Sequence, residues 1–265
     1  MKVGYYQFRP LFGKVQHNLK KVVNALQGVK ADLIVLPELA FTGYHFRDRN
    51  ELKGLAEDPD SSLTVEVLVK LCQQKNMYLV TGFAEKSKDK LFNSSLLIGP
   101  LGVEHTYRKL HLFNEEMNLF DAGDIPLQIN VVKDVKVGML VCFDWVFPET
   151  MRVLTLQGAE VIAHPSNLVL SFCQEAMITR CLENRVFAIT TNRFGSDKRP
   201  HGEIRFTGKS QIVGPGGVLI KRAASQREAL FVTEIDPEQS HNKNITALND
   251  LIADRRPEYY QDLMN

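Results

Sequence analysis

Three residues whose side chains can cooperate in nucleophilic catalysis, Glu38, Lys109 and Cys142, each follow a segment with the pattern of a strand. A cysteine becomes a strong nucleophile when a neighbouring base or positive surroundings convert its thiol to the thiolate. A carboxylate can take that proton, and an ammonium group can stabilise the oxyanion that then develops. Because ligands of α/β proteins gather at the carboxyl ends of strands, the three positions predict one site with a cysteine nucleophile.

Cys142 lies in the segment VCFDWVFPE (141–149), where a strand pattern runs into a short turn and a helix can start at Pro148. Such strand-to-helix turns present a nucleophile and leave the next backbone N–H, here that of Phe143, free as an oxyanion donor. The alternative is a small buried hydrophobic side chain, the commonest role of cysteine. That alternative fits the other three cysteines, which lie on helix patterns.

Glu38 and Lys109 each have two local interpretations. Glu38 is flanked by apolar residues in LPELAFTGY (36–44), and a buried acid there would have a raised pKa suited to a general base. It could equally cap a helix or face solvent. Lys109, in YRKLHLF (107–113), could hold an oxyanion and offset the repulsion between Glu38 and a Cys142 thiolate. Its other interpretation is the basic end of a surface strand.

Strand-like and helix-like segments alternate along the chain, as expected for an α/β protein. Strand patterns cover residues 2–8, 33–36, 77–83, 91–98, 103–108, 135–141, 161–163, 188–191, 210–213, 218–221 and 230–235. Helix patterns cover residues 15–29, 61–76 and 171–187, with a further helix start at Pro148. Residues 193–207, which contain glycine and proline, are expected to form a loop. The arginines of that loop could bind a carboxylate or lie on the solvated surface.

Two stretches of the sequence echo each other. Residues 2–4 (KVG) recur as 136–138, and 31–37 (ADLIVLP) recur as 159–165 (AEVIAHP). Each copy fits a strand, a helix, a strand and then a proline, which indicates two similar halves with mixed sheets and external helices. A chance likeness between two βαβ units is the alternative.

Length, charge and cysteine content narrow the class of protein. A chain of 265 residues suits one large α/β domain, with residues 237–265 as a polar C-terminal tail. The formal net charge of +1 gives no electrostatic footprint for nucleic acid or an anionic membrane. No apolar stretch approaches the roughly 18 residues of a membrane span. The cysteines lack the spacing of a secreted disulfide scaffold, so a cytoplasmic location is expected.

Five segments, in this chain order, resemble the nitrilase superfamily of carbon–nitrogen hydrolases. They are LIVLPELAFTGY, YRKLHLF, VGMLVCFDWVFPE, GAEVIAHPSN and RCLENRVF. The resemblance runs from about residue 2 to about residue 260, so it covers nearly the whole chain. It implies a four-layer αββα sandwich in a single domain (1–265). It also implies a homodimer or higher homo-oligomer, in which the RRPEYY segment of the tail could cross the interface.

The same resemblance implies a catalytic set of Glu38, Lys109 and Cys142, acting through a thioester with no metal or organic cofactor. Members of the family often have a second glutamate in the loop after the lysine. Glu116 is the better match, and its neighbour Glu115 is the alternative. A solvated acidic loop would be the non-functional interpretation of both.

The substrate expected from the resemblance is a small molecule with a C–N bond. The residues after Cys142 differ from the Trp-Glu that follows the cysteine of many dedicated nitrilases, which favours an amide. The segments CFDWVFPE and HPSNLV also resemble a microbial subgroup with nitrile-hydrolysing members, and N-carbamoyl amines use the same machinery. Tyr44, Trp145 and Asn167 are expected to line the pocket, with core packing or loop capping as the alternative.

Two other arrangements compete with this hypothesis. A Cys–His enzyme could use His111 or His164, which lie near strand ends, although no Cys–His signature is present. The second is a catalytically silent interaction protein of the same fold. The presence of all three catalytic residue types argues against it. Metal ligation is less favoured still, because the chain has no HExxH or CxxC motif.

Overall fold

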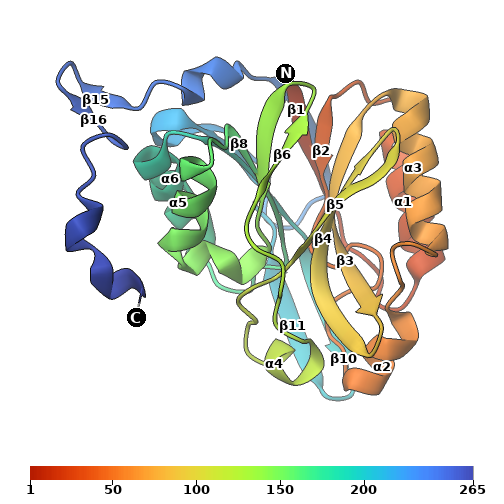
Figure 1. The fold of residues 1–265 in the computed structure, drawn as a ribbon. Coiled ribbons are helices and arrows are strands. Elements are labelled where there is room, and N and C mark those ends of the chain that lie inside the picture. Colours follow the sequence, from red (N-terminus) through yellow and green to blue (C-terminus); the bar gives the residue numbers. More distant parts are fainter. Residues whose placement is uncertain (265) are drawn as a thin grey trace.

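The computed structural model describes residues 1–264, and two six-stranded sheets packed face to face form its centre (Figure 1). The first sheet has the order β14-β1-β2-β3-β4-β5. Its strands are β1 (Lys2–Gln7), β2 (Leu33–Val35), β3 (Tyr78–Ser87), β4 (Lys90–Gly99), β5 (Gly102–Arg108) and β14 (Ala229–Glu234). The second has the order β13-β12-β9-β8-β7-β6. Its strands are β6 (Ile129–Val132), β7 (Val135–Met139), β8 (Val161–Ser166), β9 (Phe187–Asn192), β12 (Gln211–Gly214) and β13 (Val218–Arg222).

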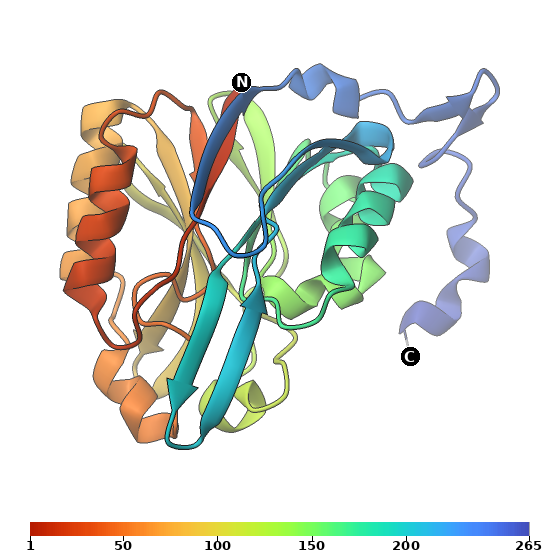
Figure 2. The same cartoon turned by 180° about the vertical axis from the view of Figure 1, so that it is seen from behind.

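Helices cover the outer face of each sheet, as the two opposite views show (Figures 1 and 2). The first sheet is covered by α1 (Val15–Leu26) and α3 (Leu63–Lys75), and the second by α5 (Pro148–Leu156) and α6 (Cys173–Asn184). Alternate residues of β2 face the two layers. Leu33 and Val35 join the core between the sheets, whereas Ile34 packs with the residues of α1 and α3. The predicted αββα sandwich is confirmed.

The two echoing stretches occupy equivalent places in the two sheets. In the first sheet β1 runs parallel to β2, with Val3 opposite Leu33. In the second sheet β7 runs parallel to β8, with Val137 opposite Val161. Each pair joins the same two positions of the repeated sequence, so both copies have the same register. The turns after β2 and β7 therefore lie at corresponding edges of the two sheets.

Local signals in the sequence fix where two of the helices begin. The Ser62 hydroxyl accepts a hydrogen bond from the Val65 N–H and caps α3. Pro148 is the first residue of α5, where its missing N–H costs nothing. Two short helices that lack a long apolar stripe were not predicted, α2 (Arg49–Leu55) and α4 (Glu116–Leu119). The short 3₁₀ segments are η1 (Cys142–Val146), η2 (Pro215–Gly217), η3 (Pro237–Ser240), η4 (Pro257–Tyr259) and η5 (Gln261–Met264).

The loop expected at 193–207 is instead a hairpin of two paired strands, β10 (Phe194–Arg199) and β11 (Gly202–Thr207). β10 does not alternate between apolar and polar residues, so it lacks the pattern of a strand, whereas β11 does alternate over residues 203–207 and was missed. A buried ion pair between Arg193 and Asp197 fixes its base, with the two side chains 2.8 Å apart. Arg193 is therefore neither on the solvated surface nor free to bind a carboxylate.

The C-terminal tail leaves the sandwich beside α5 and α6 (Figures 1 and 2). Its root is held to the body by the Arg185 side chain, which donates to the Asn242 carbonyl at 2.6 Å. Beyond this point a small hairpin, β15 (Asn244–Thr246) and β16 (Asn249–Asp250), precedes the last turns. Among residues 1–264, no helix is long and apolar enough to cross a lipid bilayer.

Candidate active site

Cys142 opens the 3₁₀ turn that follows β7, and its backbone is left-handed, with φ of +43°. Such a conformation is strained for a residue with a side chain, and the surrounding structure must hold it. Asp144 supplies part of this support, because its Oδ2 accepts a hydrogen bond from the Val141 N–H at 2.9 Å. The sequence therefore forms the sharp strand-to-helix turn that was predicted around Cys142.

Asp144 also joins this turn to the strand end that carries Lys109. Its Oδ2 accepts from the Tyr107 hydroxyl at 2.8 Å, and its Oδ1 lies 2.8 Å from the His111 Nδ1. His111 in turn stacks on Phe147, with ring centroids 3.6 Å apart. Tyr107 and His111 flank Lys109 in sequence, so a single buried carboxylate ties the nucleophile turn to the lysine segment.

Glu38 follows β2 and is fully buried. Its Oε1 accepts hydrogen bonds from the Asn93 side chain at 2.7 Å and from the Lys109 Nζ at 2.8 Å. Its Oε2 is buried and has no hydrogen-bond partner within residues 1–264. The solvent-facing and capping interpretations of Glu38 are wrong, because the whole side chain lies inside the protein.

Lys109 lies between two carboxylates. Its Nζ is 2.8 Å from the Glu38 Oε1 and 2.7 Å from the Glu116 Oε2, and the lysine side chain has no exposed surface. The Tyr44 hydroxyl donates to the Glu116 Oε1 at 2.7 Å, and the Phe113 N–H donates to the Oε2 at 3.1 Å. Glu115 points away, is exposed and contacts Asn118. The structure thus brings Glu116, and not Glu115, to Lys109, and the surface interpretation of Lys109 is wrong.

Burial and charge set the protonation states of the three groups. Burial raises the pKa of Glu38 above its ordinary value, with the Lys109 charge opposing that shift. Burial alone would lower the pKa of Lys109, but the charges of Glu116 and Glu38 raise it overall, so the ammonium form persists. Burial, followed by the charge of Glu38, raises the pKa of Cys142 well above its ordinary value. Cys142 is therefore a thiol in this environment, and a base must take its proton before it can act as a nucleophile.

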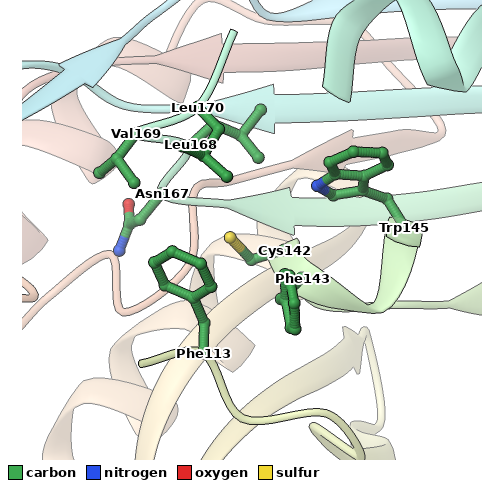
Figure 3. A pocket seen from close by; sticks show the side chains of 8 residues that line it. All are labelled: Phe113, Cys142, Phe143, Trp145, Asn167, Leu168, Val169 and Leu170. Atoms are coloured by element: carbon green, nitrogen blue, oxygen red, sulfur yellow. The ribbon is translucent and has the colours of Figure 1, made fainter. Parts of the chain in front are cut away.

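The Cys142 thiol points into a small apolar pocket (Figure 3). The pocket has a volume of about 250 Å³, including the part open to solvent. Its walls are Phe113, Phe143, Trp145, Asn167, Leu168, Val169 and Leu170. Within residues 1–264, no charged side chain lines it. Asn167 also donates from Nδ2 to the Glu38 backbone carbonyl at 2.8 Å, which connects the pocket wall to Glu38.

Most of the predicted site residues come together here, and some contributors were missed. Phe143, Trp145 and Asn167 line the pocket of Cys142, whereas Tyr44 lies behind Glu116 along a separate polar cleft. Asn93, which holds Glu38, was not predicted. Its signal was the first place in a run of three polar residues, Asn93–Ser95, between apolar residues of the buried strand β4.

The geometry gives no support to a Cys–His enzyme. Within residues 1–264, no hydrogen bond joins the Cys142 Sγ to an imidazole, because His111 binds Asp144 and His164 binds the Cys142 carbonyl. No cluster of three or more candidate metal ligands is present in the same residues.

Comparisons with known proteins identify the family to which the chain belongs. The carbon-nitrogen hydrolase family profile matches residues 2–242, so the chain belongs to that family and is an enzyme of the nitrilase and amidase type. It is 39% identical to a nitrilase of Pyrococcus abyssi over 98% of this chain and 99% of the relative. It is 32% identical to an (R)-stereoselective amidase of a Pseudomonas species, over 90% of this chain and 86% of the relative. The crystal structure of a carbon-nitrogen hydrolase from Helicobacter pylori G27 has the same fold, with a TM-score of 0.89 at 24% identity, covering 100% of this chain and 98% of that one.

Proposed function

We propose that this enzyme hydrolyses the C–N bond of a small, uncharged amide through a Cys142 thioester and releases ammonia. The observation that carries the proposal is the environment of Glu38. Its Oε1 is held by Lys109 and Asn93, while its Oε2 is buried without a partner in residues 1–264. The charge of Glu38 helps to raise the pKa of the Cys142 thiol, and we assign the unpartnered Glu38 oxygen as the acceptor of the thiol proton.

In the first half-reaction Glu38 takes the proton of Cys142 as the sulfur forms a bond to the amide carbon. The carbonyl electron pair moves to oxygen, where the Lys109 ammonium and the Phe143 N–H stabilise the charge. The C–N bond then breaks, and Glu38 gives its proton to the leaving nitrogen. Ammonia and the thioester are the products.

In the second half-reaction Glu38 takes a proton from water as the water oxygen adds to the thioester carbon. The C–S bond breaks, and the proton returns to the sulfur, so a carboxylic acid leaves and Cys142 is restored. Glu116, whose Oε1 lies 2.8 Å from the Lys109 Nζ, keeps the ammonium charged and in place throughout. The cycle consumes one water and uses no cofactor.

The size and the lining of the pocket favour a substrate with a small, uncharged acyl group. The pocket is small, about 250 Å³ including the part open to solvent. Its lining is aromatic and aliphatic apart from Cys142 and Asn167. A charged substituent would lose its hydration there without gaining a partner.

A nitrile of similar size is the second candidate substrate. It is favoured by the Pyrococcus abyssi relative, 39% identical along almost its whole length, which is named a nitrilase. N-carbamoyl amines are the third, since the same thiol addition applies to their carbonyl carbon.

An ammonia-release screen across small aliphatic and aromatic amides, the matching nitriles and N-carbamoyl amines tests the proposal. We expect turnover with apolar acyl amides and none with the Cys142→Ala variant, which serves as the blank. Turnover retained in Cys142→Ala would overturn the thioester mechanism. Turnover of nitriles but not amides would replace the proposed substrate with the second candidate. A folded wild-type chain without turnover, whose Cys142 also fails to react selectively with a thiol probe, would support the catalytically silent alternative.

We further propose that residues 1–265 act as a single hydrolase domain, with 237–265 as its tail, and that the enzyme is a cytoplasmic homodimer. The four cysteines are all unpaired, which suits a reducing compartment. Apolar side chains on the tail and on the adjacent α6 segment are exposed, among them Leu248 at 90% and Phe172 at 65%. A second copy of the chain would cover them.

A further inference from the structure

The carbonyl of Cys142 has a dedicated partner inside the second sheet. His164 lies on the central strand β8 and has no exposed surface, and its Nε2 is 2.9 Å from the Cys142 carbonyl oxygen. A carbonyl can only accept a hydrogen bond, so the Nε2 must carry the proton. The Thr190 hydroxyl, on the neighbouring strand β9, lies 3.1 Å from Nδ1 and can donate to it, which fixes this tautomer.

The bond from His164 constrains the peptide that carries the proposed oxyanion donor. The Cys142 carbonyl and the Phe143 N–H belong to one planar trans peptide, so they point in opposite directions. With the carbonyl held towards β8, the N–H must point the other way, to the side of the pocket. Within residues 1–264 the Phe143 N–H has no acceptor.

This constraint matters because the peptide is not held by regular secondary structure. Cys142 has a φ of +43°, outside the conformations that most residues prefer. Without His164, the buried Cys142 carbonyl would have to find another donor, and rotating the peptide towards one would turn the Phe143 N–H away from the substrate.

We propose that His164 is a positioning residue that aims the Phe143 N–H at the oxyanion through its hydrogen bond to the Cys142 carbonyl. The inference rests on the proposed thioester mechanism, because it assigns a role to a group that acts only during thiol addition. His164 does not touch the substrate pocket. Burial lowers its pKa from 6.5 to about 4, so the imidazole stays neutral and keeps both hydrogen bonds at neutral pH.

Two variants that differ by one methylene separate positioning from general support of the fold. In His164→Gln the amide nitrogen can reach the place of the imidazole Nε2 and donate to the Cys142 carbonyl. In His164→Asn it reaches only the place of Nδ1, beside Thr190, so the carbonyl loses its donor. We expect His164→Asn to lose about 10²-fold in kcat, as when one oxyanion donor is removed, with little change in KM, and His164→Gln to recover most of that loss.

Alkylation of Cys142 by iodoacetamide, followed by mass spectrometry, is the control for an intact nucleophile. This displacement places no negative charge on a carbonyl oxygen, so both variants should react as fast as the wild type. Equal kcat in the Asn and Gln variants would overturn the proposal. Loss of alkylation together with kcat in His164→Asn would also overturn it, because the nucleophile itself would then be damaged.

A small aldehyde gives a readout that does not depend on turnover. The Cys142 sulfur adds to its carbonyl carbon, and the thiol proton passes through Glu38 to the oxygen, which occupies the oxyanion position. Protection of Cys142 from iodoacetamide measures this binding. We expect butyraldehyde to protect the Gln variant at concentrations about tenfold lower than the Asn variant. Equal protection would overturn the role of His164, whereas a wild type that binds aldehyde but hydrolyses no substrate would count only against the proposed function.

Discussion

At the scale of single residues, the site is a row of alternating charges closed off from water. The Lys109 ammonium is shared between two buried carboxylates, Glu38 and Glu116. One ammonium group cannot neutralise both carboxylates. Burial and the remaining negative charge raise the pKa of Glu38, so this carboxylate gains a proton more readily. In the proposed mechanism, this arrangement prepares Glu38 to take the proton of Cys142 and keeps Lys109 charged for the oxyanion.

The neighbouring pair Glu115 and Glu116 offers a matched test of this charge row. We expect Glu116→Gln to lower kcat about 10²-fold, because Lys109 loses a charged partner and its position. Glu115→Gln should leave kcat unchanged, since that side chain is exposed and contacts Asn118. Steady-state kinetics of the two variants decide the point. Equal effects at both positions would contradict the assignment.

The raised pKa of Glu38 predicts the acid limb of the pH profile. Glu38 must be ionised to take the thiol proton, so kcat/KM should fall as the pH drops through its pKa. Burial raises this pKa above the ordinary 4.5, and the loss should therefore begin at a pH higher than an exposed glutamate would give. A plot of kcat/KM against pH measures it. Activity that stays flat down to the ordinary value would argue that Glu38 is not the base.

At the scale of elements, the position of Glu38 depends on a glycine in the adjacent strand. The Gly82 N–H donates to the Pro37 carbonyl at 3.1 Å, and the Gly82 carbonyl accepts from the Ala40 N–H at 3.3 Å. These bonds hold the turn around Glu38 directly against β3. A Cβ at Gly82 would lie 2.3 Å from the Glu38 Cα. No side chain therefore fits at position 82 unless Glu38 moves.

The Gly82→Ala variant should therefore damage both stability and catalysis. We expect it to cost about 1–3 kcal/mol of unfolding free energy. It should lower kcat by up to about 10²-fold, as small displacements of a catalytic group do. Gly54→Ala is the control, because Gly54 lies in α2 with no atom within 4 Å of the added Cβ. It should raise stability by up to about 1 kcal/mol and leave kcat unchanged. Urea unfolding and steady-state kinetics would show any departure.

The elements also show what the sequence could and could not predict. The long helix α1 was predictable because burial on one face leaves a periodic apolar stripe, and β2 because burial on both faces leaves a continuous apolar run. Strand β10 was not, because its one buried residue is Asp197, which pairs with Arg193 in place of an apolar face. That pairing depends on contacts that no local pattern encodes.

The same limit applies within the site. The sequence predicted that Glu38, Lys109 and Cys142 lie together, because each residue follows a predicted strand and ligands gather at the carboxyl ends of strands. The sequence left Glu115 and Glu116 open, because consecutive residues of a short helix differ only in which way they point. Asn93 was missed, because a polar residue within a buried strand gains its role only from the carboxylate of Glu38 across the sheet.

At the scale of the whole molecule, the C-terminal tail beyond Lys243 stands apart from the sandwich. Every described hydrogen bond of residues 244–264 stays within 242–264. Its apolar side chains are exposed, with Leu248 at 90%, Tyr259 at 72% and Leu263 at 66%. Exposed apolar groups gathered on an extended segment mark an interaction surface. A second copy of the chain, with its own α5, α6 and tail, offers a surface of the same kind.

Light scattering tests this dimer directly. The chain has a mass of 30.0 kDa, and we expect the wild type to have twice that mass. A truncation after Lys243 should shift the mass towards the monomer, because it removes the exposed apolar side chains of the tail. Leu248→Ser should weaken the dimer by less. Leu101→Ser is the matched control, since Leu101 is 95% exposed in the turn between β4 and β5 and lies outside the tail. A wild-type monomer, or equal effects of the two leucine substitutions, would show that the tail does not join two copies.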